Sequence, residues 1–185
     1  MKTLPTTLPG VTLIELDVHE DARGRFMETF RHDRYVEAGI DPGGPFVQDN
    51  FSSSTRGTLR GLHYQLEQPQ GKLVWATRGE VFDVVVDIRR GSPSFGGWYG
   101  ARLSANNHRQ LWIPPGFAHG FTVLSEDADV AYKVTTYYAP ADEHAIRWND
   151  PELAIAWPLK GEPALSRRDA TAPSFREAML PTWTP

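Results

Sequence analysis

Residues 48–65 read QDNFSSSTRGTLRGLHYQ, two strand-like runs separated by a polar break that contains Gly57. No other part of the sequence concentrates as many hydrogen-bonding side chains, namely Gln48, Asp49, Asn50, Arg56, Arg60, His63, Tyr64 and Gln65. A buried polar group needs a hydrogen-bond partner, so a stretch that only filled a core would carry fewer of them. The stretch predicts two strands that line a functional site, although a strand pair with one solvated face would give the same pattern.

The rest of the chain has the composition and rhythm of a mainly β protein. Its 185 residues fit one domain, residues 1–185, and 40% of them are hydrophobic, enough for a sizeable core. Short apolar runs recur every eight to twelve residues between turn signals, which is typical of a sandwich or barrel. Outside the first stretch we expect strands at 11–17, 25–31, 72–76, 80–88, 98–104, 110–113, 120–124 and 130–138.

These strands predict a β core over about 11–138 and a wrap of loops and short helices over 139–185. Residues 81–86, VFDVVV, are almost continuously apolar and predict a central strand. Ser166 with Asp169, and Ser174 with Glu177, have capping-box spacing and predict two short helices. A third short helix is expected at 33–38, with Asp33 as its cap and Gly39 as its stop.

Charge and composition exclude several function classes. The net charge of −4 argues against nonspecific nucleic-acid binding as the main role. No run approaches the roughly 20 apolar residues that span a membrane, and the start has no apolar signal-peptide region. The chain has no cysteine, which rules out disulfides and thiolate chemistry and fits a cytoplasmic location. Fifteen of its nineteen basic residues are arginine, which suits an arginine-lined pocket for an anionic ligand.

Residues 114–119, PPGFAH, fit P-x-G-x-x-H, the second motif of cupin barrels, and predict a cupin-type jelly roll with short peripheral helices. A metal-binding cupin also carries H-x-H in its first motif, where this chain has His63 followed by Gln65. His63 and His119 are too few for a metal, which needs three or four ligands. We therefore expect neither a metal nor a cofactor, and His63 is free to act as a general base near neutral pH.

Several motifs together resemble the dTDP-4-dehydrorhamnose 3,5-epimerases. That family carries Q-D/E-N-x-S followed by G-x-L-R-G-L-H-Y-Q, which stand here at 48–52 and 57–65. A later L-S-x-K/R-D motif stands at 165–169, and A-Y-K stands at 131–133. The resemblance extends over most of the chain and implies an enzyme that inverts carbons 3 and 5 of dTDP-4-keto-6-deoxyglucose. Its product would be dTDP-4-keto-L-rhamnose.

The resemblance also implies residue roles. His63 would be the base, oriented by Asp169, with Tyr132 as the acid and Lys72 as the stabiliser of negative charge, while Tyr138 would stack on the thymine. Positions matching those that hold the nucleotide sugar are Arg23, Phe26, Glu28, Gln48, Asp49, Asn50, Arg60, Lys72, His119, Tyr138, Glu143 and Arg168. Family members are homodimers whose N-terminal segments reach the neighbouring subunit, and residues 25–31 are the candidate exchanged strand.

Each role has a purely structural alternative. A lone histidine in a strand is often a satisfied structural residue, Asp169 could serve only as a helix cap, and the two tyrosines could fill the barrel core. Strict alternation also places Arg60 and His63 on opposite faces, so a shared site requires a bulge at Gly57 or Gly61.

Three rival functions stay open at this level. The nearest is a single-carbon epimerase or ketoisomerase of a related dTDP-4-keto sugar. The others are a non-catalytic sugar-nucleotide binding barrel and a metal-dependent cupin oxygenase.

Overall fold

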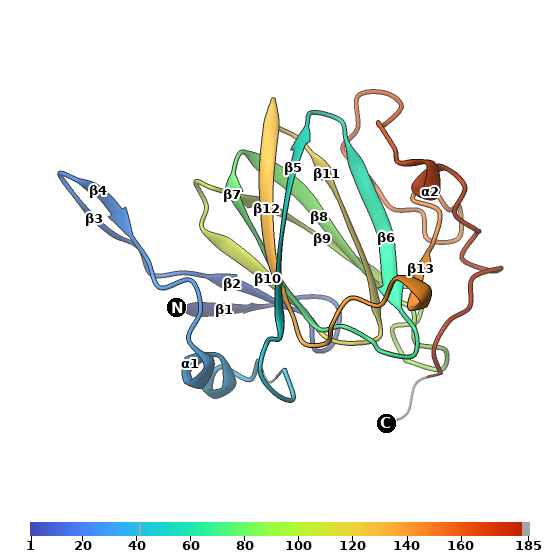
Figure 1. Ribbon diagram of the computed structural model, residues 1–185, viewed down its shortest axis with the longest axis horizontal. Coiled ribbons are helices and arrows are strands. Elements are labelled where there is room, and N and C mark those ends of the chain that lie inside the picture. Colours follow the sequence, from blue (N-terminus) through green and yellow to red (C-terminus); the bar gives the residue numbers. More distant parts are fainter. Residues whose placement is uncertain (41, 183–185) are drawn as a thin grey trace.

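The computed structural model describes residues 1–40 and 42–182, and within them two antiparallel sheets pack face to face (Figure 1). The first sheet has the order β1-β2-β10-β7-β12-β5 and the second β13-β6-β11-β8-β9. The strands of the first sheet are β1 (Lys2–Pro5), β2 (Thr12–Glu15), β5 (Gln48–Thr55), β7 (Lys72–Arg78), β10 (Arg109–Ile113) and β12 (Asp127–Val134). Those of the second are β6 (Leu59–Gln65), β8 (Glu80–Asp87), β9 (Trp98–Ser104), β11 (Phe117–Val123) and β13 (Glu143–Ala145).

The remaining elements lie around this barrel. The hairpin of β3 (His19–Asp21) and β4 (Gly24–Phe26) projects away from the body, and α1 (His32–Glu37) lies beside the first sheet (Figure 1). A short 3-10 turn, η1 (Pro140–Asp142), precedes β13. The C-terminal segment, with α2 (Arg167–Ala170), runs along the second sheet (Figure 1).

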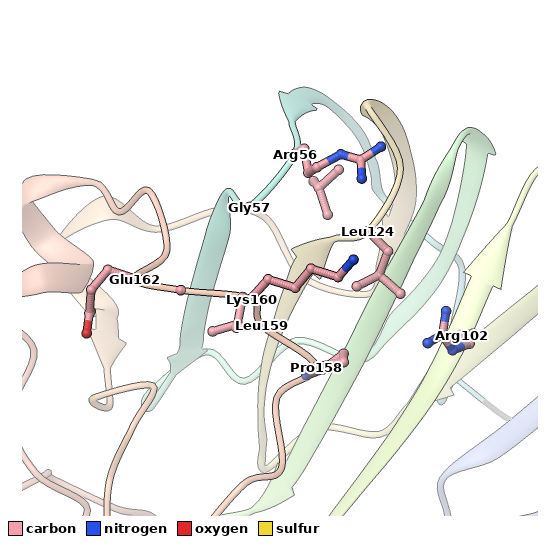
Figure 2. A pocket seen from close by; sticks show the side chains of 10 residues that line it. Arg56, Gly57, Arg102, Leu124, Pro158, Leu159, Lys160 and Glu162 are labelled. Carbon is pink, nitrogen blue, oxygen red and sulfur yellow. The ribbon is translucent and has the colours of Figure 1, made fainter.

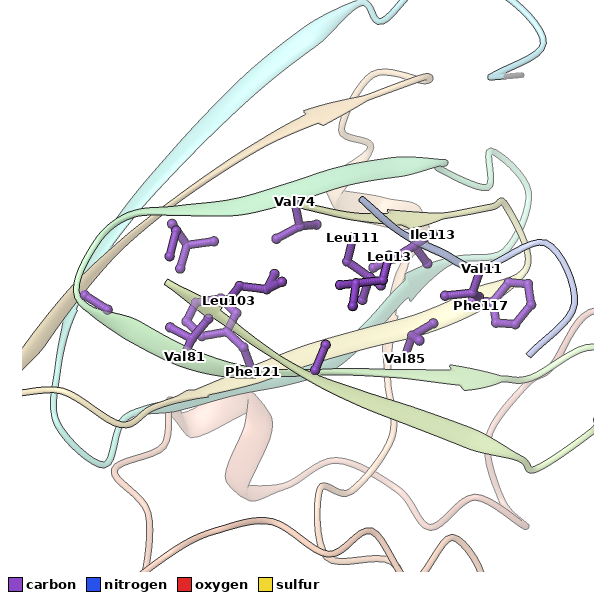
Figure 3. Packing of buried hydrophobic residues seen from close by; sticks show 14 of the residues in the cluster. Val11, Leu13, Val74, Val81, Val85, Leu103, Leu111, Ile113, Phe117 and Phe121 are labelled. Atoms are coloured by element: carbon purple, nitrogen blue, oxygen red, sulfur yellow. The ribbon is translucent and has the colours of Figure 1, made fainter. Parts of the chain in front are cut away.

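Three apolar clusters explain why the sheets pack in this way. The largest fills the space between them and includes Val74, Val85, Leu111 and Phe121 (Figure 3). A second, around Leu62 and Val84 and the residues Ile146, Leu153 and Phe175, joins the outer face of the second sheet to the C-terminal wrap. A third, around Leu73, Trp112, Tyr35 and Ile40, joins the outer face of the first sheet to the segment that contains α1. Both sheets are therefore covered on two faces over much of their area.

Strand β8 shows how this arrangement accounts for its sequence. It is hydrogen-bonded to β11 on one side and β9 on the other. Val81 and Val85 pack in the cluster between the sheets, whereas Val84 and Val86 pack under the C-terminal wrap. Because successive side chains of a strand point to opposite faces, a strand buried on both is apolar at most positions, as the run of valines here is. The prediction of a central strand at 81–86 is confirmed.

Several expected boundaries are wrong. Strand β12 ends at Val134 and does not reach Tyr138, and β4 ends at Phe26, so residues 27–31 are not a strand. Helix α1 begins after Arg31, which makes no side-chain cap, so Asp33 is not the cap. Ser174 and Glu177 do make the reciprocal hydrogen bonds of a capping box, with Ser174 Oγ donating to Glu177 Oε2 over 2.7 Å. Only a turn follows them.

The β core also extends beyond the expected 11–138. Strand β1 pairs with β2 at the edge of the first sheet, and β13 pairs with β6 at the edge of the second. Pro5 lacks a backbone N–H, and edge strands are where a sheet tolerates that loss. Within the described residues, no helix is long and apolar enough to cross a membrane.

Candidate active site

A cavity of about 340 Å³ lies between the sheets, next to the apolar core. Its walls come from β5, β7 and β12 of the first sheet and β6 and β11 of the second. The lining residues are Asn50, Ser52, Arg60, His63, Gln70, Lys72, His119, Gly120, Phe121, Tyr132, Tyr138, Glu143, Ser166 and Asp169. The structure thus brings together most of the polar residues that the sequence singled out.

His63 and Asp169 form the closest pair of titratable groups in the cavity. His63 Nε2 lies 2.5 Å from Asp169 Oδ1, and the aspartate is almost fully buried. Burial raises the pKa of Asp169, but the hydrogen bond and charge of His63, helped by Ser166, outweigh it, so the pKa falls below 3.8. An ionised carboxylate only accepts hydrogen bonds, so Nε2 carries the ring proton. Nδ1 is then left with the lone pair that a general base requires.

Asp169 is a dyad partner and part of a helix cap at once. The Ser166 hydroxyl donates to Asp169 Oδ2 over 2.8 Å and accepts from the Asp169 backbone N–H, which caps α2. The other carboxylate oxygen, Oδ1, holds His63. The two interpretations of this residue are therefore compatible.

A bulge brings Arg60 to the same side of β6 as His63. On β11, His119 lies opposite His63 and Phe121 lies opposite Arg60. The two residues of β11 are two positions apart, whereas the two residues of β6 are three positions apart, so β6 carries one extra residue there. Gly61 lies inside this shift with φ of +111°, and a Cβ on it would come within 2.6 Å of the His119 carbonyl oxygen. Only glycine fits there without strain. The expected bulge at Gly57 or Gly61 is therefore found at Gly61.

Ser54 holds Arg60 in the cavity wall. The Nε of Arg60 donates to the Ser54 hydroxyl over 3.0 Å. Within the described part of the chain, the two terminal amino groups of Arg60 make no hydrogen bond. They are available to an anionic ligand, and a guanidinium suits a phosphate through paired hydrogen bonds.

The interior holds a second histidine–aspartate pair. His119 Nε2 lies 2.8 Å and 3.0 Å from the two carboxylate oxygens of Asp83, and Asp83 is fully buried. Asp83 is not among the residues predicted for the site, although one signal was available: it is the single charged residue in the apolar run 81–86. A charge inside a buried strand has to be paired.

Lys72 is buried on β7, and its ammonium group makes no hydrogen bond to any described residue. Burial lowers its pKa from 10.5 to about 8, while the charges of Glu143 and Asp83 act in the opposite direction. The lysine is therefore mostly protonated at neutral pH but close to losing its charge. Such a group can stabilise negative charge that develops nearby.

Tyr132 lies on β12, in the wall opposite His63 on β6. Burial raises the pKa of its phenol, Glu143 adds to the increase, and Arg60 opposes it. Tyr132 therefore keeps its proton at neutral pH and can donate it. A proton acceptor and a proton donor face the cavity from different sheets.

The mouth of the cavity is organised by Glu143. Tyr138 Oη donates to Glu143 Oε2 over 2.6 Å, and Arg168 forms an ion pair with the same carboxylate. The backbone N–H of Tyr138 donates to Gln48, whose amide nitrogen donates to Asn50 over 2.8 Å. These contacts explain why Tyr138 lines the cavity although it lies in a loop beyond β12.

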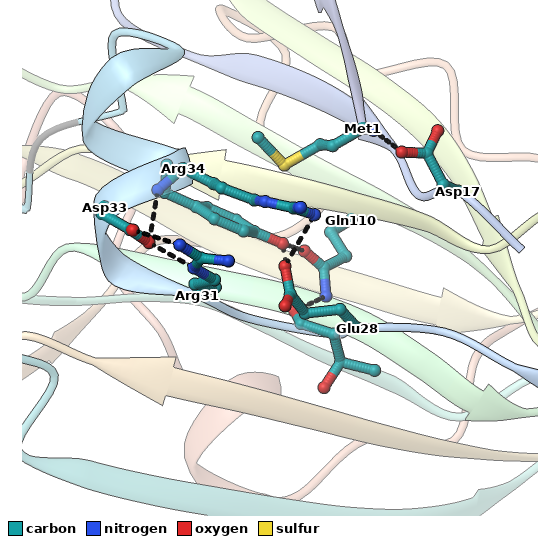
Figure 4. A network of polar contacts seen from close by, with 9 residues as sticks. Met1, Asp17, Glu28, Arg31, Asp33, Arg34 and Gln110 are labelled. Carbon is teal, nitrogen blue, oxygen red and sulfur yellow. Dashed lines mark hydrogen bonds and ion pairs between the residues drawn. The ribbon is translucent and has the colours of Figure 1, made fainter.

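Six expected site residues do not line this chain's cavity. Two of them, Gln48 and Arg168, lie at its mouth and contact Tyr138 and Glu143. The other four lie away from it. Arg23 pairs with Asp21 at the tip of the projecting hairpin, and Phe26 on the same hairpin is 71% exposed. Figure 4 shows Glu28 in a surface network, where Arg34 donates to it over 3.1 Å. Asp49 points to the outer face of β5, where Lys133 Nζ donates to it over 2.9 Å. Nothing in a single chain brings these residues to the cavity.

The arrangement is suited to proton transfer on an anionic ligand. It offers an oriented histidine, a protonated tyrosine, a buried lysine and, on Arg60 in the cavity wall, free guanidinium donors. In the described residues, no group of three or more His, Asp or Glu side chains is placed to hold a metal ion.

Comparison with known proteins gives consistent results. The family model for dTDP-4-dehydrorhamnose 3,5-epimerase matches residues 5–177. A protein of that name from Pseudomonas aeruginosa is 56% identical over 96% of this chain and 98% of its own length. A crystal structure of dTDP-6-deoxy-D-glucose-3,5-epimerase from Legionella pneumophila, in complex with dTDP-4-keto-L-rhamnose, superimposes with a TM-score of 0.97. It is 50% identical and covers 100% of this chain and 99% of its own.

A somewhat more distant relative has a different name. The 3'-monoepimerase of Streptomyces bikiniensis, in complex with dTDP-quinovose, is 39% identical with a TM-score of 0.89. That match covers 96% of this chain and 92% of its own. The cupin-like β fold expected from sequence is confirmed by these likenesses. The chain belongs to the dTDP-4-dehydrorhamnose 3,5-epimerase family of isomerases.

Proposed function

We propose that this protein inverts carbons 3 and 5 of dTDP-4-keto-6-deoxyglucose and so forms dTDP-4-keto-L-rhamnose. The observation that carries the proposal is the oriented pair of His63 and Asp169, which faces the cavity from the sheet opposite Tyr132. Epimerisation needs a base and an acid on the two sides of one carbon, and this pair of walls supplies both. Family membership and the ligand of the Legionella relative support the choice of substrate.

The reaction proceeds through an enolate. His63 removes the proton from carbon 3, and the electron pair moves towards the oxygen at carbon 4, where the Lys72 ammonium stabilises the negative charge. Tyr132 then returns a proton to the opposite face of the carbon as the carbonyl reforms. The same ketone acidifies carbon 5, so one set of groups serves both positions. No electron is gained or lost, and the step needs no cofactor.

The nucleotide binds across the mouth of the cavity. Tyr138 stacks on the thymine, and Glu143 and Arg168 fix the position of that tyrosine. The free donors of Arg60 bind the diphosphate, while Gln48, Asn50 and His119 contact the rest of the nucleotide sugar. Both histidines therefore contact the substrate, but only His63 acts as the base.

We further propose a cytoplasmic homodimer in which the projecting hairpin completes the neighbouring site. Arg23, Phe26, Glu28 and Asp49 lie outside this chain's cavity, and an exposed Phe26 on a projecting hairpin is suited to burial against a second copy. The cysteine-free composition fits a reducing compartment. Analytical ultracentrifugation should give the mass of two chains, and a monomer at micromolar concentration would overturn this part of the proposal.

A single-carbon epimerase is the second candidate, favoured by the likeness to the Streptomyces bikiniensis monoepimerase. Proton NMR of dTDP-4-keto-6-deoxyglucose in deuterated water, with catalytic amounts of the protein, separates the two. Deuterium at both carbons 3 and 5 is expected. Exchange at one carbon would assign the second candidate, and exchange at neither would overturn the proposed function.

A further inference from the structure

Strand β6 ends at Gln65, just beyond the residues that line the cavity. Its side chain is buried, with 5% of the residue exposed, and it lies two positions after His63. Leu62 and Tyr64 pack under the C-terminal wrap, so alternation turns His63 and Gln65 to the opposite face of the strand. Gln65 does not line the cavity itself, and a role in binding has to act through another residue.

The amide of Gln65 binds the backbone of two loops. Its nitrogen donates to the carbonyl oxygen of Gln68 over 2.7 Å and to that of Tyr137 over 3.3 Å. Its oxygen accepts from the backbone N–H of Ala139 over 2.9 Å. Tyr137 and Ala139 are the residues on either side of Tyr138. One side chain therefore holds the backbone on both sides of that tyrosine.

The backbone around Tyr138 depends on such contacts because it belongs to neither a strand nor a helix. Strand β12 ends at Val134, and the turn η1 begins only at Pro140. Backbone N–H and C=O groups beyond the end of a strand have to find other partners. Gln48 of β5 accepts from the N–H of Tyr138 over 3.0 Å, and Gln65 holds the flanking residues from β6. The loop is thus fixed from both sheets.

The hydroxyl of Tyr138 is held from the same place. Glu143, which accepts from Tyr138 Oη over 2.6 Å, lies opposite Gln65 in the pairing of β13 with β6. Gln65 fixes the backbone of the tyrosine, and Glu143 fixes the tip of its side chain, although the residue is 47% exposed. A ring that is already ordered loses less conformational freedom when a ligand binds to it, and so binds more tightly.

We propose that Gln65 is a positioning residue for nucleotide binding, which fixes the ring of Tyr138 in the orientation that stacks on the thymine. The proposal rests on the function proposed above, because it takes Tyr138 to be the residue that meets the thymine. His63 lies on the same strand, so β6 fixes both the catalytic base and the tyrosine that places the nucleotide.

The test compares Gln65→Met with Gln68→Met. Methionine keeps the length of the side chain but has no donor and only a weak acceptor. The side chain of Gln68 is exposed, and its backbone contacts survive the substitution, so Gln68→Met is the matched control. By calorimetry the dissociation constant for dTDP should rise about fivefold in Gln65→Met, part of what the whole ring contributes.

Turnover supplies the contrast that marks a positioning role. At saturating dTDP-4-keto-6-deoxyglucose, kcat of Gln65→Met should stay within about twofold of wild type, because the groups that move protons are unchanged. Gln68→Met should leave both dTDP affinity and kcat within about twofold. Unchanged dTDP affinity in Gln65→Met would overturn the proposal, and so would a tenfold fall in kcat at unchanged affinity.

A double-mutant cycle with Tyr138→Ala separates positioning from general support of the fold. If Gln65 acts through the ring, Gln65→Met should leave the dTDP affinity of the Tyr138→Ala protein within about twofold. A residue that only stabilises the fold would weaken binding by the same factor in both backgrounds, and that result would overturn the proposal. If Gln65→Met does not fold, Gln65→Asn takes its place, since it keeps an amide but is one methylene too short to hold both loops.

Failure of the proposed reaction gives a different result. A wild-type protein that binds dTDP but exchanges no deuterium would overturn the reaction, and the calorimetric cycle would still decide the role of Gln65. A Tyr138→Ala protein that binds dTDP as tightly as wild type would show that Tyr138 does not meet the thymine, and would overturn the proposal for Gln65.

Discussion

Two of the hollows in the described part of the chain, an inner cavity and an outer groove, are of similar size, but only the inner one holds its polar groups in fixed positions. The inner cavity measures about 340 Å³, while a groove of about 420 Å³ lies on the outside, lined by Arg56, Gly57, Arg102, Val123, Leu124, Pro158, Leu159, Lys160, Gly161 and Glu162. Figure 2 shows the groove's basic side chains coming from separate elements and pointing in different directions. The groove is the larger of the two and carries more cationic side chains.

The difference lies in how the polar groups are held. In the inner cavity, His63, His119 and Arg60 each have a fixed partner from a second element. In the groove, the exposed Arg102 pairs with Glu80. Neither Arg56 nor Lys160 has a side-chain hydrogen bond or ion pair within the described residues. Exposed cations are screened by water and salt and keep their side-chain freedom. Volume and charge alone therefore do not identify a site, whereas fixed orientation does.

His63→Ala should cause the largest loss of activity, because it removes the side chain that the inner cavity holds in a fixed orientation. We expect kcat to fall about 10³-fold, within the range for loss of a general base. Deuterium uptake at carbon 3 should be abolished, measured by proton NMR. The matched control is His32→Ala, an exposed histidine at the start of α1, which should retain full activity. Full exchange at carbon 3 by His63→Ala would show that another residue is the base.

Lys72 should make activity depend on pH on the alkaline side. Its pKa of about 8 means that the ammonium is lost as the pH rises through that value. kcat/KM, which reports groups of the free enzyme, should then fall. Lys72→Met should be about 10²-fold slower and should lack this alkaline limb. Lys133→Met, on the outward side of β12, is the control. An alkaline limb that persists in Lys72→Met would assign it to another group.

The same shift has a consequence for stability. Lys72 in the folded chain releases its proton near pH 8, whereas the unfolded chain keeps it to about 10.5. Between these values the unfolded state binds more protons, so the Lys72 contribution to the free energy of unfolding rises with pH. The difference in urea unfolding between wild type and Lys72→Met, followed across that window, measures it.

Tyr138→Ala should affect nucleotide binding rather than turnover. Tyr138 is half-exposed at the mouth of the cavity, where Glu143 holds it. Affinity for dTDP should fall about tenfold, because stacking on one base is worth about 1–3 kcal/mol. Turnover at saturating substrate should change little. Calorimetry with dTDP and steady-state kinetics test both, and a large fall in turnover with unchanged affinity would contradict the assignment.

Substitutions in the outer groove should have the smallest effect on activity and on nucleotide binding. Arg56→Ala with Lys160→Ala removes two of its cations, and we expect kcat/KM and dTDP affinity within about twofold of wild type. A loss of tenfold or more would mean that the groove takes part in substrate binding, and would end the contrast drawn between the two hollows.

Much of the fold followed from sequence because its signals are local. Alternation, turn residues and the double burial of β8 predict where strands lie, and β9 was placed with its observed ends. Strand β1 was missed because it is short, exposed and contains proline. Tyr138 was wrongly placed in a strand, since nothing local indicates that β12 stops at Val134.

Some of the site residues could be predicted from the sequence and others could not. His63, Asp169, Tyr132 and Lys72 were found through a resemblance, and the structure places all four on one cavity. Asp83 was missed, because its importance depends on its complete burial and on the histidine that reaches it from the neighbouring strand β11. Both depend on contacts in three dimensions, for which the order of residues carries only a weak signal.

The carboxylate of Asp169 couples the folding of helix α2 in the C-terminal wrap to the orientation of the catalytic histidine in the barrel. One of its oxygens closes the cap of α2, and the other orients His63. Opening of residues 166–170 alone would thus release the histidine while both sheets stayed folded, a partial unfolding that silences the site. Acid should act at the same point: the pKa of Asp169 is depressed, so the stability it contributes is present at neutral pH and disappears as the pH falls through the folded value. Hydrogen exchange at α2 would then report on catalytic competence more directly than global melting does.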